Sequence, residues 1–275
     1  MTITRIWLSS LLLAMSLPVS AQRGDYPDPR TPRTKDGRPD LTASAPRLNG
    51  TPDLFGVWQA ERAPMVEFAH VLGDDRANLQ VDLNDVSRHY MSVFWGEEPE
   101  AEPLRPEAAA ILKHRLQSPT QSPMTHCLPI GVPAVAFVYE FKLVQAPQEI
   151  VMLSETADPA RQIYIDGRTL PKNPEPSWMG YSAGRWDGDT LVVETAGFTE
   201  RSWLDGAGHP RSELMHITER YFRRDFGHLD LEVTFDDPKY YTRPFKLKTR
   251  LTLVPDSDVY EFVCAENEKD LAHLK

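Results

Sequence analysis

Beyond Ala21 the sequence lacks any apolar run long enough to cross a membrane. The apolar run from Ile6 to Leu17 is itself well short of the ~20 residues that a membrane-spanning helix needs. We therefore expect no membrane span, and the short N-terminal run needs another explanation.

Basic residues are also scarce. Lys and Arg number 30 against 40 Asp and Glu, so the formal net charge is −10. An acidic surface repels phosphate groups, and no basic stripe with interleaved aromatic residues is present in the sequence. We therefore expect no nucleic-acid partner and no attraction to an anionic membrane surface.

Sequence motifs for common cofactors are missing as well. There is no G-x-x-x-x-G-K-[ST] motif and no G-x-G-x-x-G between a strand and a helix, so nucleotide binding is not indicated. There is also no H-E-x-x-H motif. We expect no cofactor and no metal, while a metal site assembled from the distant residues His126, His209 and His216 stays open.

The N-terminus has the pattern of a secretory signal peptide. Arg5 gives a positive start, Ile6 to Leu17 an apolar centre, and Val19-Ser20-Ala21 a small-x-small cleavage site. No cysteine follows these small residues, so a lipid anchor is not expected. We expect residues 1–21 to be removed and the protein to be exported to the periplasm or to the outside of the cell.

The two cysteines, Cys127 and Cys264, have three interpretations. In an oxidising compartment an even number favours a disulfide, which would close a loop of about 138 residues and contribute ~5 kcal/mol in the chain-entropy estimate. A reactive Cys127 activated by His126 is the second, although adjacent residues on an extended chain point to opposite sides. Two inert thiols are the third. We predict the disulfide.

The mature chain divides into an arm and one folded domain. Residues 22–50 are rich in Pro, Arg, Asp and Gly and have hardly any apolar residues, so we expect a disordered arm. Residues 51–275 form the domain, which opens on the segment from Pro52 to Trp58. The spacing and composition of Asp82–Trp95 and Pro106–Leu116 predict two short helices.

Nine predicted strands follow the helices. They are Phe137–Ala146, Glu149–Glu155, Arg161–Ile165, Tyr181–Trp186, Asp189–Gly197, Glu213–Arg223, His228–Phe235, Phe245–Val254 and Asp258–Cys264. The pairs Asp166-Gly167 and Asp187-Gly188 favour tight turns. A meander of short strands must close or be covered to remove its edges. We therefore predict a mainly β fold, either an antiparallel up-and-down barrel of lipocalin-like type or a sandwich.

One long run carries a resemblance to a known family. The segment Pro176–Thr195 reads PSWMGYSAGRWDGDTLVVET, and His126-Cys127-Leu128-Pro129 and Trp203-Leu204-Asp205 match the same pattern. The chain resembles a family of exported bacterial proteins of unassigned function. The resemblance implies bacterial export and a β-rich fold. Gly56-x-Trp58 also resembles the G-x-W opening of lipocalins, in which a tryptophan packs across the floor of the barrel.

The segment from Asn173 to Asp205 is dense in aromatic residues. Aromatic walls with a few polar groups are common in small-molecule cavities, although ordinary packing explains the same residues. The predicted ligand-binding residues are Trp178, Tyr181, Trp203 and Arg220.

Titratable residues near strand ends and in loops are candidate acid/base groups. A histidine exchanges a proton near neutral pH, and a partly buried glutamate can have a raised pKa. The predicted catalytic residues are His126, Glu155, Asp205 and His216. On the strand Glu213–Arg223, His216 and Arg220 share one face, so their role depends on which face lines a cavity.

A catalytic serine is not expected, although Gly180-Tyr181-Ser182-Ala183-Gly184 matches G-x-S-x-G. In α/β-hydrolases this serine lies on a turn between a strand and a helix. Here the turn at Asp187-Gly188 leads into another strand. We therefore interpret Ser182 as part of a strand in which the glycines relieve crowding.

Three functions fit these observations. The first is an enzyme that acts on a small organic molecule by acid/base chemistry, as an isomerase, lyase or hydrolase. The second is a binding protein for an apolar or aromatic small molecule in the cell envelope. The third is a structural protein whose arm docks on a partner. The sequence favours the first narrowly and gives no oligomeric state.

Overall fold

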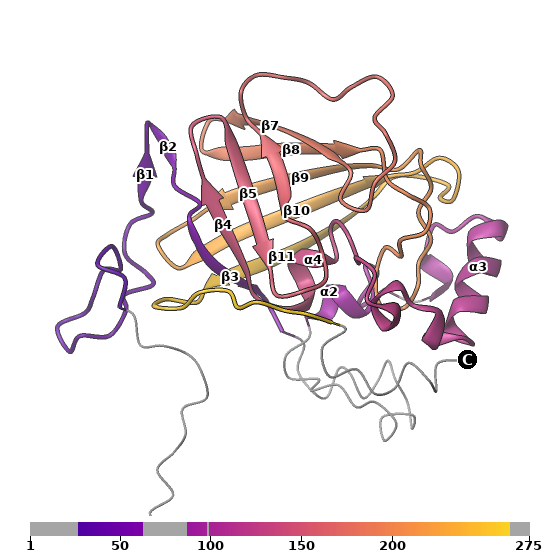
Figure 1. Ribbon diagram of the computed structural model, residues 1–275, viewed down its shortest axis with the longest axis horizontal. Coiled ribbons are helices and arrows are strands. Elements are labelled where there is room, and N and C mark those ends of the chain that lie inside the picture. The colour runs from indigo at the N-terminus through magenta and orange to yellow at the C-terminus, as the bar shows by residue number, and fades with distance from the viewer. Residues whose placement is uncertain (1–26, 63–86, 98, 265–275) are drawn as a thin grey trace, which may run out of the picture.

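The computed structural model describes residues 27–62, 87–97 and 99–264, which form a closed barrel of nine β-strands (Figure 1). The barrel strands are β3 (Gly56–Ala60), β4 (Phe141–Gln145), β5 (Glu149–Ser154), β6 (Arg161–Tyr164), β7 (Tyr181–Asp187), β8 (Thr190–Ala196), β9 (His216–Arg223), β10 (His228–Asp236) and β11 (Phe245–Leu253). The mainly β barrel is thus confirmed, and the closed sheet excludes a sandwich.

Strands that follow one another in the sequence lie side by side, and the sheet closes where β11 pairs with β3. The barrel departs from a purely antiparallel meander at one place, because β6 and β7 run parallel with Ile163 opposite Ser182. A closed ring with an odd number of strands cannot alternate in direction all the way round, so one parallel pair is required. Residues 165–180 make this crossover.

The two ends of the barrel differ. The short connections β4–β5, β7–β8 and β9–β10 lie at one end, which we call the hairpin end. The longer connections β3–β4, β8–β9 and β10–β11 lie at the other, which we call the loop end and which carries the helices (Figure 1).

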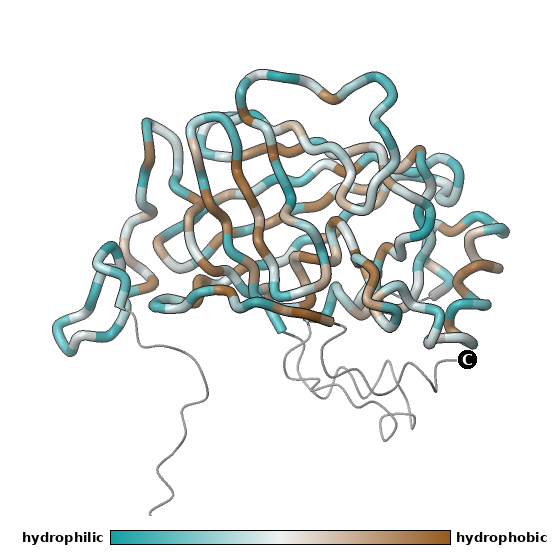
Figure 2. The backbone as a smooth tube through the Cα atoms, viewed as in Figure 1, coloured by the Kyte–Doolittle hydropathy of each residue, from teal (hydrophilic) through white to brown (hydrophobic). Residues whose placement is uncertain are grey.

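Alternating side chains fill the interior of the barrel. On β10, the side chains of Leu229, Leu231, Val233 and Phe235 are buried and those between them are partly exposed. β11 follows the same rule, and Figure 2 shows brown and teal residues alternating along the strands. This period of two places one face of each strand in a single apolar core.

The helices are short and lie between β3 and β4. They are α2 (Arg88–Met91), α3 (Pro106–Leu116), α4 (Val135–Val138) and the 3-10 helices Pro99–Ala101, Pro119–Gln121 and Pro123–His126. The predicted helix Pro106–Leu116 is confirmed. The predicted helix Asp82–Trp95 begins outside the described residues and is reduced to α2 within them. No helix in the described part of the chain is long and apolar enough to cross a membrane.

Residues 27–50, which we expected to be disordered, have a defined conformation on the barrel. A two-stranded ribbon of β1 (Arg47–Leu48) and β2 (Thr51–Pro52) leads into β3. The backbone N–H groups of Phe226 and Gly227 donate hydrogen bonds to Ala43 and Leu41. Backbone hydrogen bonds and ion pairs hold this arm on the barrel. They order it although it has few apolar side chains.

The end of the described chain also differs from the prediction. Residues 254–264 form an extended tail without strand pairing, where we predicted a strand over Asp258–Cys264. The tail ends in a disulfide between Cys264 and Cys127, whose Cα atoms are 5.4 Å apart. The predicted disulfide is therefore confirmed, and the strand that completes the barrel is β3.

Candidate functional site

Asp205 belongs to a buried charged cluster at the loop end. Its carboxylate lies 2.6 Å from Nδ1 of His209, whose Nε2 lies 3.2 Å from Glu102. Burial acts to lower the pKa of His209, but the two carboxylates outweigh burial and raise the pKa to about 9. At neutral pH, His209 is therefore an imidazolium with a carboxylate beside each ring nitrogen. Asp205 also accepts a hydrogen bond from the backbone N–H of Val93, which ties the loop to the helical region.

The other predicted acid/base residues lie in different surroundings. His126 is exposed at the end of a 3-10 helix. Glu155 follows β5 and accepts a hydrogen bond of 3.0 Å from the backbone N–H of Tyr260. His216 is partly exposed at the start of β9. The three histidines considered above as distant metal ligands do not form a metal-binding group within the described residues.

The predicted ligand-binding aromatic residues make separate contacts. The Arg201 guanidinium lies 5.2 Å from the ring of Trp178, and that of Arg115 lies 5.0 Å from the ring of Trp203. Tyr181 packs against Tyr164 with ring centroids 5.4 Å apart. These residues therefore do not share one wall.

The inward face of β9 carries Ile217, Glu219 and Tyr221, which are all buried. His216 and Arg220 lie on the outward face, where Arg220 donates a hydrogen bond of 3.1 Å to Asp187. His216 and Arg220 therefore do not point into the core.

A buried polar cluster in the barrel core was not anticipated from the sequence. Arg161 on β6 forms an ion pair with Glu219 on β9 and donates hydrogen bonds to Ser182 on β7 and Thr195 on β8. The Tyr221 hydroxyl donates a hydrogen bond of 2.8 Å to Glu219. Each of these side chains is at most 1% exposed. Ser182 is therefore a partner of a buried arginine.

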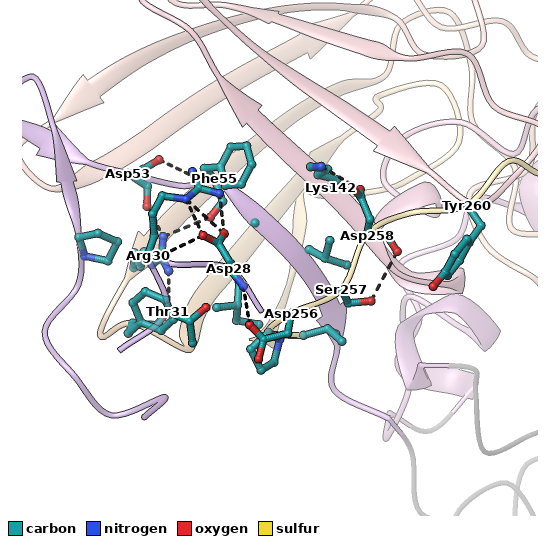
Figure 3. A pocket seen from close by; sticks show the side chains of 18 residues that line it. Asp28, Arg30, Thr31, Asp53, Phe55, Lys142, Asp256, Ser257, Asp258 and Tyr260 are labelled. Carbon is teal, nitrogen blue, oxygen red and sulfur yellow. Dashed lines mark hydrogen bonds and ion pairs between the residues drawn. The ribbon is translucent and has the colours of Figure 1, made fainter. Parts of the chain in front are cut away.

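A pocket of about 610 Å³ lies where the arm and the tail meet beside β3, β4 and the β9–β10 turn (Figure 3). We call it the arm–tail pocket. Its charged and aromatic lining residues are Asp28, Arg30, Asp53, Phe55, Lys142, Arg223, Phe226, Asp256, Asp258 and Tyr260. Its volume is within the range of small-molecule sites, roughly 300–1,000 Å³.

Phe55 lies between two cations in this pocket. The Arg30 guanidinium is 4.0 Å from the centre of the Phe55 ring, and the Lys142 ammonium is 5.5 Å from it. Each cation also has a carboxylate: Asp28 lies 2.6 Å from Arg30, and Asp258 lies 2.8 Å from Lys142. Both cations are thus paired with carboxylates of the protein itself.

Arg223 borders the pocket at the end of β9, close to the tryptophan of the G-x-W segment. Its guanidinium lies 4.9 Å from the ring of the fully buried Trp58 and donates to the carbonyl oxygens of Asp53 and Phe226. Burial lowers the pKa of Arg223 to about 10, so it remains charged at neutral pH. These contacts hold the Arg223 side chain between the pocket and the core.

Two aspartates of the lining, Asp28 and Asp258, form ion pairs with lining cations. The lining includes no histidine and no cysteine. The hydrogen bond from Arg30 lowers the pKa of Asp28, and that from Lys142 lowers the pKa of Asp258, so both remain ionised at neutral pH. General acid/base catalysis needs a group that exchanges a proton near the working pH.

Comparisons with protein families, with curated proteins and with solved structures return no match. The pocket itself is therefore the basis for a functional proposal. Sequence reasoning missed it because its walls come from two segments, the arm and the tail, that we expected to be a disordered stretch and a strand. Phe55, which directly precedes the Gly56-x-Trp58 motif, was a local signal in the sequence.

Proposed function

We propose that this protein is an exported binding protein for an apolar or aromatic small molecule, which it holds in the arm–tail pocket. The observation that carries the proposal is a pocket of ligand size in which an aromatic ring, apolar strand residues and compensated charges lie together. Export remains part of the proposal, on the basis of the signal-peptide pattern in residues 1–21.

The lining supports an apolar or aromatic ligand. Phe55, Phe226, Leu253 and Val254 give apolar surface, so burial of a ring or hydrocarbon against them is favourable. A charged group on the ligand would compete with Asp28 for Arg30 or with Asp258 for Lys142. Ligands with a neutral aromatic body therefore suit the pocket best.

A fluorescence titration with the neutral aromatic probe N-phenylnaphthylamine tests the proposal. We expect Phe55→Ala, which removes the aromatic wall, to weaken binding about tenfold or more, and Ser257→Trp to weaken it by filling the space. The matched control is Phe222→Ala, because Phe222 is an aromatic residue of the outer barrel surface and is 43% exposed.

The two substitutions and the control separate the possible outcomes. The proposal predicts weaker binding in both pocket variants and unchanged binding in Phe222→Ala. Equal affinity of the wild type, Phe55→Ala and Ser257→Trp for the probe would show that the arm–tail pocket is not the binding site.

A further inference from the structure

The tail forms one wall of the arm–tail pocket. It supplies Val254, Pro255, Asp256, Ser257, Asp258 and Tyr260 to the lining. In Figure 3 the tail passes beside Lys142 and meets the arm where Asp256 lies next to Asp28. The position of the tail therefore determines whether the pocket has a closed wall.

The start of the tail is held by the barrel and the arm. The backbone N–H of Val254 donates a hydrogen bond of 2.8 Å to Val57 on β3. The Asp256 carboxylate accepts hydrogen bonds from the backbone N–H of Asp28 and from the Arg33 side chain, each of 2.8 Å. This part of the tail has anchors on both sides.

The later part of the tail has weaker non-covalent anchors. Asp258, which pairs with Lys142, is 63% exposed, so water screens this ion pair. Tyr260 is held by the hydrogen bond from its backbone N–H to Glu155 and is 41% exposed. Within the described residues, nothing from Ser257 to Cys264 is paired in the sheet.

The covalent anchor is the disulfide at the far end of the tail. Cys127 lies in a folded turn, since its backbone N–H bonds to Met124 and that of Leu128 bonds to Pro123. Both cysteines are partly exposed, so a thiol in solution can reach the bond. The disulfide therefore links the pocket wall to a fixed point on the loop end.

We propose that the Cys127–Cys264 disulfide is a redox switch of the arm–tail pocket: oxidation completes the pocket and reduction opens it. The inference rests on the proposed function. In the reduction, a thiolate of a dithiol attacks one sulfur of the disulfide, and the second thiol of the reductant then releases the mixed disulfide. The protein gains two electrons and two protons, and the dithiol becomes a cyclic disulfide.

Opening follows from the loss of the far anchor. Once Cys264 is free, residues 257–264 keep the exposed contacts of Asp258 and Tyr260 described above, and segments held in this way open locally at little cost. A ligand that binds the reduced protein has to order the tail again, which weakens its affinity. Oxidation in the compartment outside the cytoplasm would then give the binding-competent form.

The test compares three forms of the mature protein with N-phenylnaphthylamine. They are the oxidised wild type, the wild type reduced by dithiothreitol under native conditions, and the double variant Cys127→Ser, Cys264→Ser. We expect affinity at least about tenfold lower in the reduced and double-variant forms. Hydrogen exchange should increase in residues 257–264 and remain unchanged in β8 to β10.

Two controls keep the result specific. Dithiothreitol should not change probe binding by the double variant, which has no disulfide to reduce. Far-UV circular dichroism reports whether the barrel is folded, and trimethylamine N-oxide, which favours the folded state, is added to all forms if the β signal falls on reduction.

The redox inference and the proposed function can fail separately. If Phe55→Ala weakens binding but the oxidised and reduced wild type bind the probe equally, the switch is wrong and the binding function stands. Unchanged exchange in residues 257–264 after reduction would also overturn the switch. If Phe55→Ala and Ser257→Trp bind as the oxidised wild type does, the pocket is not the site, and both proposals fall.

Discussion

Arg161 reaches from β6 across the barrel core to Glu219 on β9 and contacts side chains of β7 and β8 on the way. Because the cluster is fully buried, the ion pair gains little from its charges alone once their desolvation is counted. Its members are all hydrogen-bonded, so it constrains the register of four neighbouring strands. Removing only one of the two charged partners should therefore lower the free energy of unfolding.

Replacing Arg161 with methionine should destabilise the fold by about 3 to 5 kcal/mol, because it leaves the carboxylate of Glu219 buried without its cation. The double variant Arg161→Met, Glu219→Leu should recover most of this loss. The measurement is chemical unfolding of all forms. A single-variant loss below about 1 kcal/mol would contradict this description of the cluster.

His209 should make the stability of the protein depend on pH. Its pKa is raised to about 9 in the folded state, so its contribution is fully present below about pH 6.5 and is lost as the pH rises through about 9. The shift corresponds to a contribution on the order of 3 kcal/mol. We expect wild-type unfolding free energy to fall in this window and that of His209→Gln to change less. Parallel pH profiles for the two proteins would exclude this role.

Some residue-level features were predictable from the sequence and others were not. The Cys127–Cys264 bridge was predicted from an even cysteine count and the signal-peptide pattern of the sequence. The partnership of Arg161 and Glu219 did not, because the residues are far apart in sequence and only the strand register turns both side chains inward. Asp205 was predicted as a catalytic candidate, and nothing in the sequence indicated the buried ion pair that it forms with His209.

At the scale of elements, the arm and the tail hold each other in place. Arg33 of the arm and Asp256 of the tail form an ion pair, and Asp256 has a left-handed backbone with φ of 57°. An aspartate accepts this conformation more readily than most residues, and so does an asparagine. The two segments that sequence reasoning assigned least well therefore form a joint structure.

Asp256→Asn should loosen the arm, because it keeps the backbone conformation and removes the charge that holds Arg33. We expect faster hydrogen exchange in residues 27–40 and unchanged exchange in the barrel strands. The control is Asp236→Asn, which makes the same charge change at an exposed residue at the end of β10. Arm exchange that is equal in the wild type and Asp256→Asn would argue against this anchor.

The strands with regular alternation were the most predictable elements. β9, β10 and β11 bury every second residue, and their predicted ranges match the structure to within a few residues. The arm and the tail lack this signal. Their conformation depends on hydrogen bonds to distant segments, such as those from Phe226 and Gly227 to the arm, which no local pattern reveals.

At the scale of the whole molecule, the barrel serves as a packed support and the candidate site lies outside its core. The interior is filled by one apolar cluster and the Arg161–Glu219 cluster. The pocket lies where the arm and the tail meet beside the β9–β10 turn (Figure 3). A scaffold of this kind leaves the pocket walls free to respond to the disulfide without unfolding the barrel.

The central claim is that the arm–tail pocket holds a small organic molecule. The most direct measurement is a native mass spectrum of the mature protein purified from its own compartment, recorded beside the Ser257→Trp variant. We predict a bound apolar or aromatic molecule that is released on denaturation and is absent from the variant. The same molecule bound equally to both proteins would contradict the claim.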